Sequence, residues 1–359
     1  MTNRRRILRT IRGEEVDRFP VWLKMDNHTW RSSQPDAVRT LDSEELLEVA
    51  GCDRMLHVKP RICCDTPHAT IEVSEKDGLR RTVANTPDGE LVGEEKLDPY
   101  TQSWHPSRYM AERLEDLPKL RWLFEDTRHS VADDDAEACA VRAEELRRRD
   151  FVVCTGVGPG PLMNMVEHLC GPVAAIYHLT DARDVFEELL ELMHADHMRH
   201  LRALLDCLKA DMLWMSENTS TTLISPDIFL RYCAGHLEDY GRLILEYGVI
   251  PVHHMCGRLN ALLEMIDPLP AMANEAYTTP PLGDVTLTEG RTRMPSKALI
   301  GGTNATLWMQ PAETIIETVA EDIAACPDRR KIFLTSAGVL PAGVSIEKAR
   351  QVTDGLKRL

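Results

Sequence analysis

The segment Gly248-Val249-Ile250-Pro251-Val252-His253-His254-Met255-Cys256-Gly257-Arg258 is the part of the sequence on which our interpretation of the chain depends. It begins as a short apolar run typical of a buried strand, and a helical pattern follows from Leu259 to Ile266. Two imidazoles and a thiol therefore lie where a strand ends and a helix begins, the place where α/β barrels build their sites. His and Cys suit zinc, but a hydrogen-bonded core histidine and a space-filling cysteine would give the same pattern.

The charge and the cysteine content limit the class of protein. The 359 residues carry a formal net charge of −15, which disfavours nucleic acid and anionic membranes as partners because both require basic patches. No secretory segment and no run of about 18 apolar residues occurs, so we expect a soluble cytoplasmic protein. The ten cysteines have no regular spacing, and we expect them to be reduced and mostly buried.

The order of predicted elements indicates one large α/β domain. Eight candidate strands, most of them followed by a helical pattern, predict a (β/α)8 TIM barrel formed by residues 1–359 as a single domain. The candidate strands are residues 18–23, 54–58, 151–154, 212–215, 248–252, 271–275, 298–304 and 331–336.

Residues 69–98 have a different period. Apolar and polar residues alternate on both sides of Asp77-Gly78, a pair typical of a two-residue hairpin turn, and Pro87-Asp88-Gly89 marks a second turn. We therefore expect an inserted antiparallel hairpin region, which is a candidate lid.

Polar residues follow most of the predicted strands, and in a barrel these positions converge on one pocket. Glu217, His254 and Cys256 would supply the three protein ligands of a catalytic zinc, although Glu217 could instead cap a helix or form a salt bridge. Successive strand side chains alternate, so His254 and Cys256 share a face and His253 points away. The other residues at strand ends are Asp26, His28, His57, Glu275, Asn304 and Ser336.

Three tryptophans lie in or just beyond predicted strands. Trp22, Trp30 and Trp214 are core residues in one interpretation and the wall of a pocket for an aromatic substrate in the other. The segment 155–161 lacks the lysine of a P-loop and is expected to be an ordinary turn. His194 and His197 fall on a helical face, where we expect solvated or packing roles.

Several motifs resemble the uroporphyrinogen decarboxylase superfamily over nearly the whole chain. Val16-Asp17-Arg18-Phe19-Pro20-Val21-Trp22 resembles its opening strand, and Leu223-Ile224-Ser225-Pro226-Asp227-Ile228-Phe229 resembles one of its helix starts. His254-Met255-Cys256-Gly257 is similar to the H-x-C-G of its corrinoid-dependent methyltransferases, and residues 333–343 resemble its terminal motif. The hairpin region resembles a subgroup near the methyltransferases that demethylate methoxylated compounds.

The departures from that family narrow the implied function. The decarboxylases carry an arginine-rich segment after the first strand, whereas residues 24–30 contain no arginine, so a porphyrin with many carboxylates is disfavoured. The methyltransferases have a second metal-binding cysteine in the terminal motif, where this chain has Val339. The resemblance therefore implies that a carboxylate, for which Glu217 is the candidate, completes the metal site.

We thus predict a zinc-dependent methyltransferase that moves a methyl group from a methoxylated small molecule, with aryl ethers as candidates, to the cobalt of a corrinoid (cobalamin). A partner corrinoid protein would carry the corrinoid, and a homodimer is a candidate assembly. The alternatives are a decarboxylase-like lyase acting on a smaller acid and a non-catalytic corrinoid-binding barrel. The predicted catalytic residues are Glu217 and His254, the predicted metal ligands are Glu217, His254 and Cys256, and the predicted substrate pocket comprises Asp26, His28, Trp30, His57, Trp214, Glu275 and Asn304.

Overall fold

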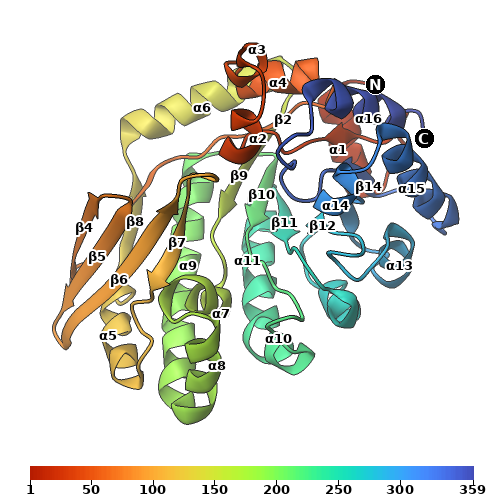
Figure 1. Cartoon of the computed structure of the whole chain (residues 1–359). Coiled ribbons are helices and arrows are strands. Elements are labelled where there is room, and N and C mark those ends of the chain that lie inside the picture. The colour runs from red at the N-terminus through yellow and green to blue at the C-terminus, as the bar shows by residue number, and fades with distance from the viewer. The chain divides into compact units, whose positions relative to one another are not determined.

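A computed structural model describes all residues, 1–359, and its central feature is a sheet of eight parallel strands in the order β1-β14-β13-β12-β11-β10-β9-β2. The predicted (β/α)8 barrel is confirmed: the sheet is a nearly closed barrel, and helices lie between its strands along the chain (Figure 1). The strands are β1 (Val21–Trp22), β2 (Met55–His57), β9 (Val152–Val157), β10 (Met212–Met215), β11 (Ile250–His254), β12 (Ala273–Tyr277), β13 (Ala298–Gly301) and β14 (Ile332–Thr335).

The barrel strands are buried on both faces because side chains fill the inside and helices cover the outside. Every residue of β10, β12, β13 and β14 is buried. These strands consist mainly of Ala, Leu, Ile, Met, Phe and Trp, which accounts for their nearly continuous apolar runs in the sequence.

Asp53 bridges the two end strands of the sheet. Its backbone N–H donates to the carbonyl of Val21 at 2.7 Å, and its carboxylate accepts from the Val21 N–H at 2.9 Å. The side chain is fully buried, and its charge is balanced by ion pairs to Arg6 at 2.8 Å and Arg18 at 2.7 Å. A buried carboxylate needs such partners, so Asp53 joins the N-terminal helix to the closing edge of the barrel.

The chain falls into two compact units. The first unit contains the barrel and comprises residues 1–59, 139–157 and 209–359, and the second comprises residues 60–138 and 158–208. The helices of the first unit are α1 (Asn3–Arg12), α2 (His28–Ser32), α3 (Asp36–Arg39), α4 (Ser43–Val49), α10 (Pro226–Tyr232), α11 (Ala234–Glu246), α12 (Leu263–Ile266), α13 (Leu287–Arg293), α14 (Ala305–Trp308), α15 (Ala312–Ala325) and α16 (Ile346–Leu356), with the 3-10 turn η4 (Asn260–Leu262). Helix α6 (Asp133–Arg148) contains residues of both units.

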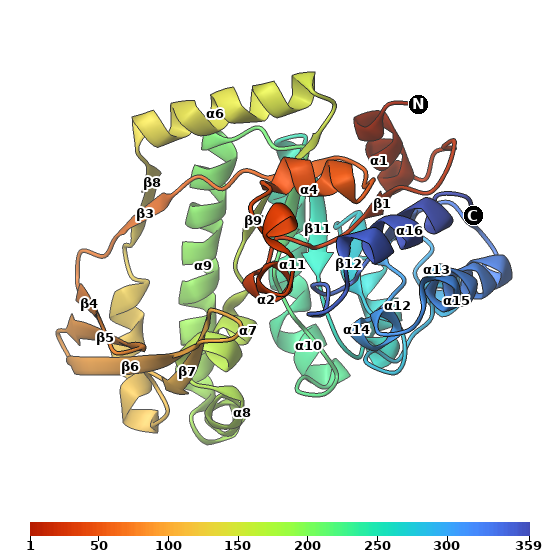
Figure 2. The ribbon, with the colours of Figure 1, turned by 45° about the horizontal axis from the view of Figure 1, so that its top comes forward.

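The second unit contains the antiparallel sheets. Strands β4 (Thr70–Lys76), β5 (Leu79–Thr86), β6 (Gly89–Asp98) and β7 (Ser103–Arg108) form one sheet, and β3 (Ile62–Asp65) pairs with β8 (Arg128–Val131) in another (Figure 2). Its helical segments are η1 (Leu114–Asp116), α5 (Leu117–Leu120), η2 (Arg121–Leu123), α7 (Pro161–Asn164), the π-helical turn η3 (Met165–Leu169), α8 (Pro172–Asp181) and α9 (Arg183–Cys207).

The predicted hairpin lies in this second unit. Asp77 and Gly78 both have positive φ, 52° and 72°, as a two-residue hairpin turn requires, and Lys76 pairs with Leu79 across it. The antiparallel region is larger than the predicted residues 69–98, because β7, β3 and β8 extend it. The division into two compact units does not test whether the chain folds as a single domain, which stays a prediction.

Two further expectations concern the cysteines and membrane-spanning helices. Four of the ten cysteines are buried and three are exposed, so the expectation that most are buried is wrong. None of the helices combines the length and the apolar composition required to cross a lipid bilayer.

Candidate active site

The first unit contains a pocket of about 760 Å³ at the carboxyl ends of several barrel strands. Residues that end or follow β1, β2, β10 and β11 line it, among them Lys24, His57, Ser216 and His254. This is the face on which barrel enzymes build their sites, because the loops there vary without disturbing the strands.

Three ionisable side chains, Lys24, Glu275 and His254, contact one another in series beside this pocket. His254 and Glu275 occupy paired positions of the neighbouring strands β11 and β12, and His254 Nδ1 is hydrogen-bonded to Glu275 Oε2. Lys24, just after β1, forms an ion pair with the other carboxylate oxygen of Glu275 and donates to the carbonyl of Ala337 at 2.9 Å. Glu275 is fully buried, so the two partners supply the compensation that a buried carboxylate requires.

These partners determine the protonation of the pair. Burial tends to raise the pKa of Glu275, but the Lys24 ammonium and the His254 hydrogen bond outweigh it, so the pKa lies below its usual value. Burial tends to lower the pKa of His254, yet hydrogen bonds to Cys256 and Glu275 outweigh it and raise that pKa to about 9. Because the Glu275 carboxylate accepts the Nδ1 proton, Nε2 is the nitrogen of His254 that remains for a ligand or a second proton.

Cys256 lies on the exposed side of His254. Its thiol is hydrogen-bonded to His254 and lies 3.6 Å from Oδ1 of Asn218, in the loop after β10. The Asn218 N–H donates to the His254 carbonyl at 2.9 Å, which fixes this loop against the end of β11. The structure therefore brings together two of the three predicted zinc ligands, His254 and Cys256.

Glu217, the third predicted ligand, is directed elsewhere. Its side chain is 1 % exposed and is hydrogen-bonded to the buried thiol of Cys233, the residue that follows α10. No group of three or more His, Cys, Asp or Glu residues in the chain is arranged so that it could hold an ion. Asn218, and not Glu217, is the residue of this loop that contacts Cys256.

Aromatic rings form one wall of the pocket. Trp22 and Trp214 meet edge to face with centroids 5.8 Å apart, and the His57 ring meets Trp214 in the same way at 4.9 Å. Burial and the nearby Lys59 lower the pKa of His57 to about 4, so its imidazole is neutral near pH 7. Trp214 lines the pocket but is only 6 % exposed, so it belongs both to the pocket wall and to the hydrophobic core.

Of three further residues predicted to line the pocket, Asp26, His28 and Trp30, only Asp26 does so in the structure. Asp26 lines the pocket, where it accepts a hydrogen bond from Ser43 at 2.7 Å. His28 is exposed at the start of α2 and does not line the pocket. Trp30 is fully buried and donates to the Val344 carbonyl at 2.8 Å, so it is a core residue.

Asn304, which was also predicted to line the pocket, does not line it. Its side chain caps α14 by accepting from the Leu307 N–H at 2.9 Å and also donates to the Pro280 carbonyl at 2.9 Å. A strand-end asparagine in an extended conformation is a favourable N-cap, which accounts for the difference.

The choice between the two adjacent histidines agrees with the structure. His254 lines the pocket, whereas His253 is fully buried and neither of its ring nitrogens has a hydrogen-bond partner. Burial, with a contribution from Lys297, lowers the pKa of His253 to about 3, so this ring is neutral.

Lys24 lines the pocket and pairs with Glu275, but the sequence interpretation did not include it among the site residues. It had a detectable signal, because it lies at the carboxyl end of the first strand, two residues after the pocket residue Trp22. Val339, which takes the place of the cysteine implied by the family resemblance, is 52 % exposed and lines the same pocket.

A barrel with a pocket at the carboxyl ends of its strands has the architecture of a TIM-barrel enzyme. Residues 130–359 match the family described as uroporphyrinogen decarboxylase (URO-D), and the chain belongs to that family, as predicted. No curated protein sequence matches the chain.

Two solved structures give a measure of the structural likeness. A methyltransferase from Methanosarcina mazei is similar over 100 % of this chain and 99 % of its own, with a TM-score of 0.62 and 16 % identity, a level at which the likeness concerns the fold. The putative vitamin-B12 independent methionine synthase from Listeria monocytogenes covers 66 % of this chain and 72 % of its own, with 15 % identity, and its TM-score of 0.40 supports no further argument.

Proposed function

We propose that this chain is a methyltransferase that moves a methyl group from a methoxylated small molecule to the cobalt of a corrinoid carried by a partner protein. The observation that carries the proposal is the His254–Cys256 pair beside an aromatic-walled pocket, held from behind by Glu275 and Lys24. The methyltransferase from Methanosarcina mazei, which has a similar fold over 99 % of its own length, supports the same function.

The proposal includes a zinc ion at His254 and Cys256, whose nitrogen and sulfur atoms suit that metal. Metal-binding histidines commonly donate their second ring N–H to a carboxylate, and Glu275 occupies that position on Nδ1. Glu217 is the proposed third ligand, and to reach the other two its side chain would have to leave Cys233. Bound zinc would supply a Lewis acid for the oxygen that leaves the methyl group.

The protein side chains would act on the substrate by binding and orientation. Trp22 and Trp214 offer edges and faces that match a flat aromatic ring, and neutral His57 adds no charge to that wall. A phenolate leaves more readily than an alkoxide because the pKa of a phenol is about 10. Aryl methyl ethers are therefore the substrates that we propose first.

Methyl transfer can be measured directly with cob(I)alamin as the acceptor. We expect transfer from at least one member of a panel of methoxyarenes, methanol and methylamines, and about one zinc per chain. His254→Ala and Cys256→Ala should abolish transfer and lower the zinc content, whereas the exposed His105→Ala should change neither. A zinc-containing protein that transfers no methyl group from any of these donors would contradict the proposal.

The family match supports one second candidate, a lyase that removes carbon dioxide from a small acid. The pocket has few uncompensated cations for an acid, because Lys24 is paired with Glu275 and Arg142 with Glu44. The two functions differ in their products: the lyase would release carbon dioxide with no corrinoid present. The same panel extended to small carboxylic acids distinguishes them.

A further inference from the structure

The second unit contains a group of nucleophilic and titratable residues that the proposed methyl transfer does not use. Cys64 on β3 and His129 on β8 occupy paired positions of the antiparallel ladder, and Cys64 Sγ lies 3.4 Å from His129 Nδ1. The other ring nitrogen of His129, Nε2, lies 2.8 Å from Oδ1 of Asp196 on α9. A thiol, an imidazole and a carboxylate are thus joined in series.

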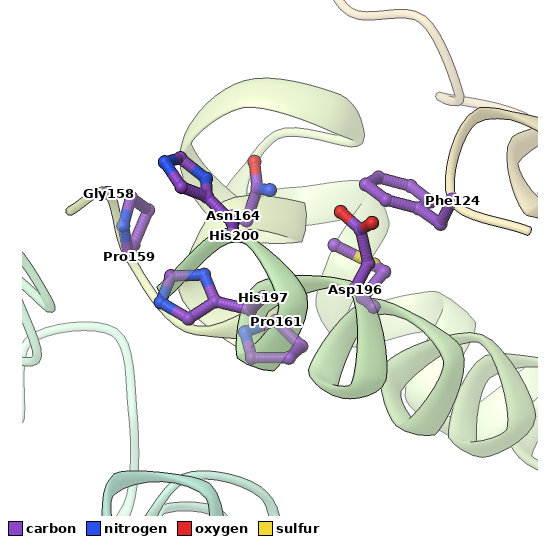
Figure 3. A pocket seen from close by; sticks show the side chains of 9 residues that line it. Phe124, Gly158, Pro159, Pro161, Asn164, Asp196, His197 and His200 are labelled. Atoms are coloured by element: carbon purple, nitrogen blue, oxygen red, sulfur yellow. The ribbon is translucent and has the colours of Figure 1, made fainter. Parts of the chain in front are cut away.

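The carboxylate end of this series is held in place. Arg199, one helical turn beyond Asp196, donates to Asp196 Oδ1 at 3.0 Å and to the backbone carbonyls of Phe124 and Thr127 at 2.8 and 3.0 Å. The His129 side chain is 4 % exposed and that of Asp196 is 12 % exposed, so both are shielded from water. Asp196 also lines a cavity of about 220 Å³ together with His197 and His200 of the same helix (Figure 3).

This arrangement determines the tautomer of His129. A carboxylate can only accept hydrogen bonds, so the Nε2 atom facing Asp196 carries a proton, and Nδ1 is the ring nitrogen that faces Cys64 and can hold the thiol proton. Transfer of the thiol proton to Nδ1 would give a thiolate beside an imidazolium with both of its N–H groups bonded. The thiolate is the nucleophilic form of cysteine.

The side chains around His129 are Cys64 on β3, His200 stacked on the His129 ring, and Asp196 with its partner Arg199 on α9. Burial lowers the pKa of His129, but the bonds to Asp196 and Cys64 outweigh it and raise the pKa to about 9. His200 stacks on His129 with centroids 5.0 Å apart, and burial, followed by the charge of His129, lowers the His200 pKa, so His200 does not compete for the proton.

We propose that Cys64, His129 and Asp196 form a thiol relay that makes Cys64 a site of covalent modification by small disulfides. Cys64 is exposed, so a small disulfide can reach it without a conformational change. The proposal is independent of the proposed methyl transfer, because none of its three residues belongs to the barrel pocket.

The reaction is a thiol–disulfide exchange. The proton of the Cys64 thiol moves to His129 Nδ1, and the thiolate attacks one sulfur of the disulfide. A new bond forms between Cys64 Sγ and that sulfur, the original disulfide bond breaks, and the leaving thiolate takes the proton back from His129. Cys64 is oxidised, one half of the disulfide is reduced to a thiol, and no other reactant is needed.

The neighbouring Cys63 is a control within the same molecule. It is also exposed on β3, but strand side chains alternate between faces, and its cross-strand partner is Ser130 rather than a histidine. Any general effect of unfolding, reagent concentration or pH would act on both thiols. A difference between the two rates therefore reports on the relay.

The test is the rate of alkylation by iodoacetamide at each cysteine of the full chain, followed by peptide mass spectrometry from pH 5 to 10. We expect Cys64 to react at least about tenfold faster than Cys63 at pH 6 to 7, since only Cys64 is hydrogen-bonded to an imidazole that can hold its proton, and the thiolate is the reactive form. With oxidised glutathione, the mixed disulfide should form on Cys64 before Cys63. Equal rates at the two cysteines would overturn the proposal.

Variants separate the relay from the local environment. His129→Gln should lower the Cys64 rate to that of Cys63 and leave the Cys63 rate unchanged, and Asp196→Asn should give an intermediate rate. His105→Gln, on the exposed strand β7, should leave both rates unchanged. If His129→Gln proves unstable, the comparison of the two cysteines in the wild-type protein still decides, and a Cys64 rate unaffected by a folded His129→Gln would also overturn the proposal.

Discussion

The two units of this protein contain the same order of chemical groups in different surroundings. In the barrel, Lys24, Glu275, His254 and Cys256 form a series of cation, carboxylate, imidazole and thiol. In the second unit, Arg199, Asp196, His129 and Cys64 form an equivalent series. Both imidazoles have a pKa raised to about 9 by these partners, and both thiols are exposed.

The difference lies in the burial of the carboxylate and in the pocket that the barrel imidazole, His254, lines. Glu275 is fully buried at a pocket of about 760 Å³ with aromatic walls. The Asp196 side chain is 12 % exposed, and Cys64 lies on an exposed strand. We therefore propose substrate recognition for the series in the barrel and thiol reactivity for the series in the second unit, so that the surroundings, and not the order of the groups, distinguish the two sites.

The largest expected effect comes from removing the buried charge in the barrel. Glu275→Gln leaves the Lys24 ammonium, which is 15 % exposed, without its partner, and breaking such a buried pair costs about 3 to 5 kcal/mol of unfolding free energy. Asp196→Asn should cost about 1 to 2 kcal/mol, because the Arg199 side chain is 38 % exposed and can be solvated. Urea unfolding followed by tryptophan fluorescence measures both.

A double variant provides the control for this comparison. Lys24→Met in the Glu275→Gln protein removes the orphaned charge, so part of the lost stability should return. If Glu275→Gln costs no more than Asp196→Asn, the two series are energetically equivalent and the distinction drawn from burial fails.

The next effect concerns activity. Glu275→Gln should lower kcat/KM for methyl transfer by about 10- to 100-fold, since a residue that orients a metal-binding histidine typically contributes that much. The zinc content should fall together with the rate. A variant that loses activity while keeping full zinc occupancy would show that Glu275 acts on the substrate and not through His254.

The fold was largely predictable because it depends on local patterns. Alternation of apolar runs and helical patterns predicted all eight barrel strands, and Asp77-Gly78 predicted its hairpin turn. Strand alternation also separated His254 from His253: His254, at the end of β11, is partly exposed and lines the pocket, whereas His253 is fully buried.

The arrangement of the site was less predictable because it depends on loop conformation and on distant contacts. Asn218 has a positive φ of 51°, and no pattern indicated that Glu217 beside it would turn to Cys233. The ion pair of Lys24 and Glu275 joins the first barrel strand to β12 across the sheet. Cys64 and Asp196 lie 65 and 67 positions from His129, too far apart for any sequence spacing to connect them.

A smaller effect should appear in the pH dependence of stability. The pKa of His129 is raised from 6.5 to about 9, so its protonated form stabilises the folded state fully below pH 6.5, and this contribution is lost as the pH rises to about 9. The stability difference between wild type and His129→Gln should therefore shrink over this range. Urea unfolding at pH 6, 7.5 and 9.5 measures it, and a difference that grows with pH would contradict the assignment.

The smallest effect concerns the aromatic wall of the barrel pocket. Trp214→Phe keeps an aromatic ring but loses part of the edge-to-face contacts with Trp22 and His57, which are worth about 0.5 to 1.5 kcal/mol. For methoxyarenes KM should rise about 2- to 10-fold with little change in kcat, whereas methanol, which is too small to lie against the wall, should be affected less. Equal changes for both donors would mean that Trp214 acts only as a core residue and not as a wall of the substrate pocket.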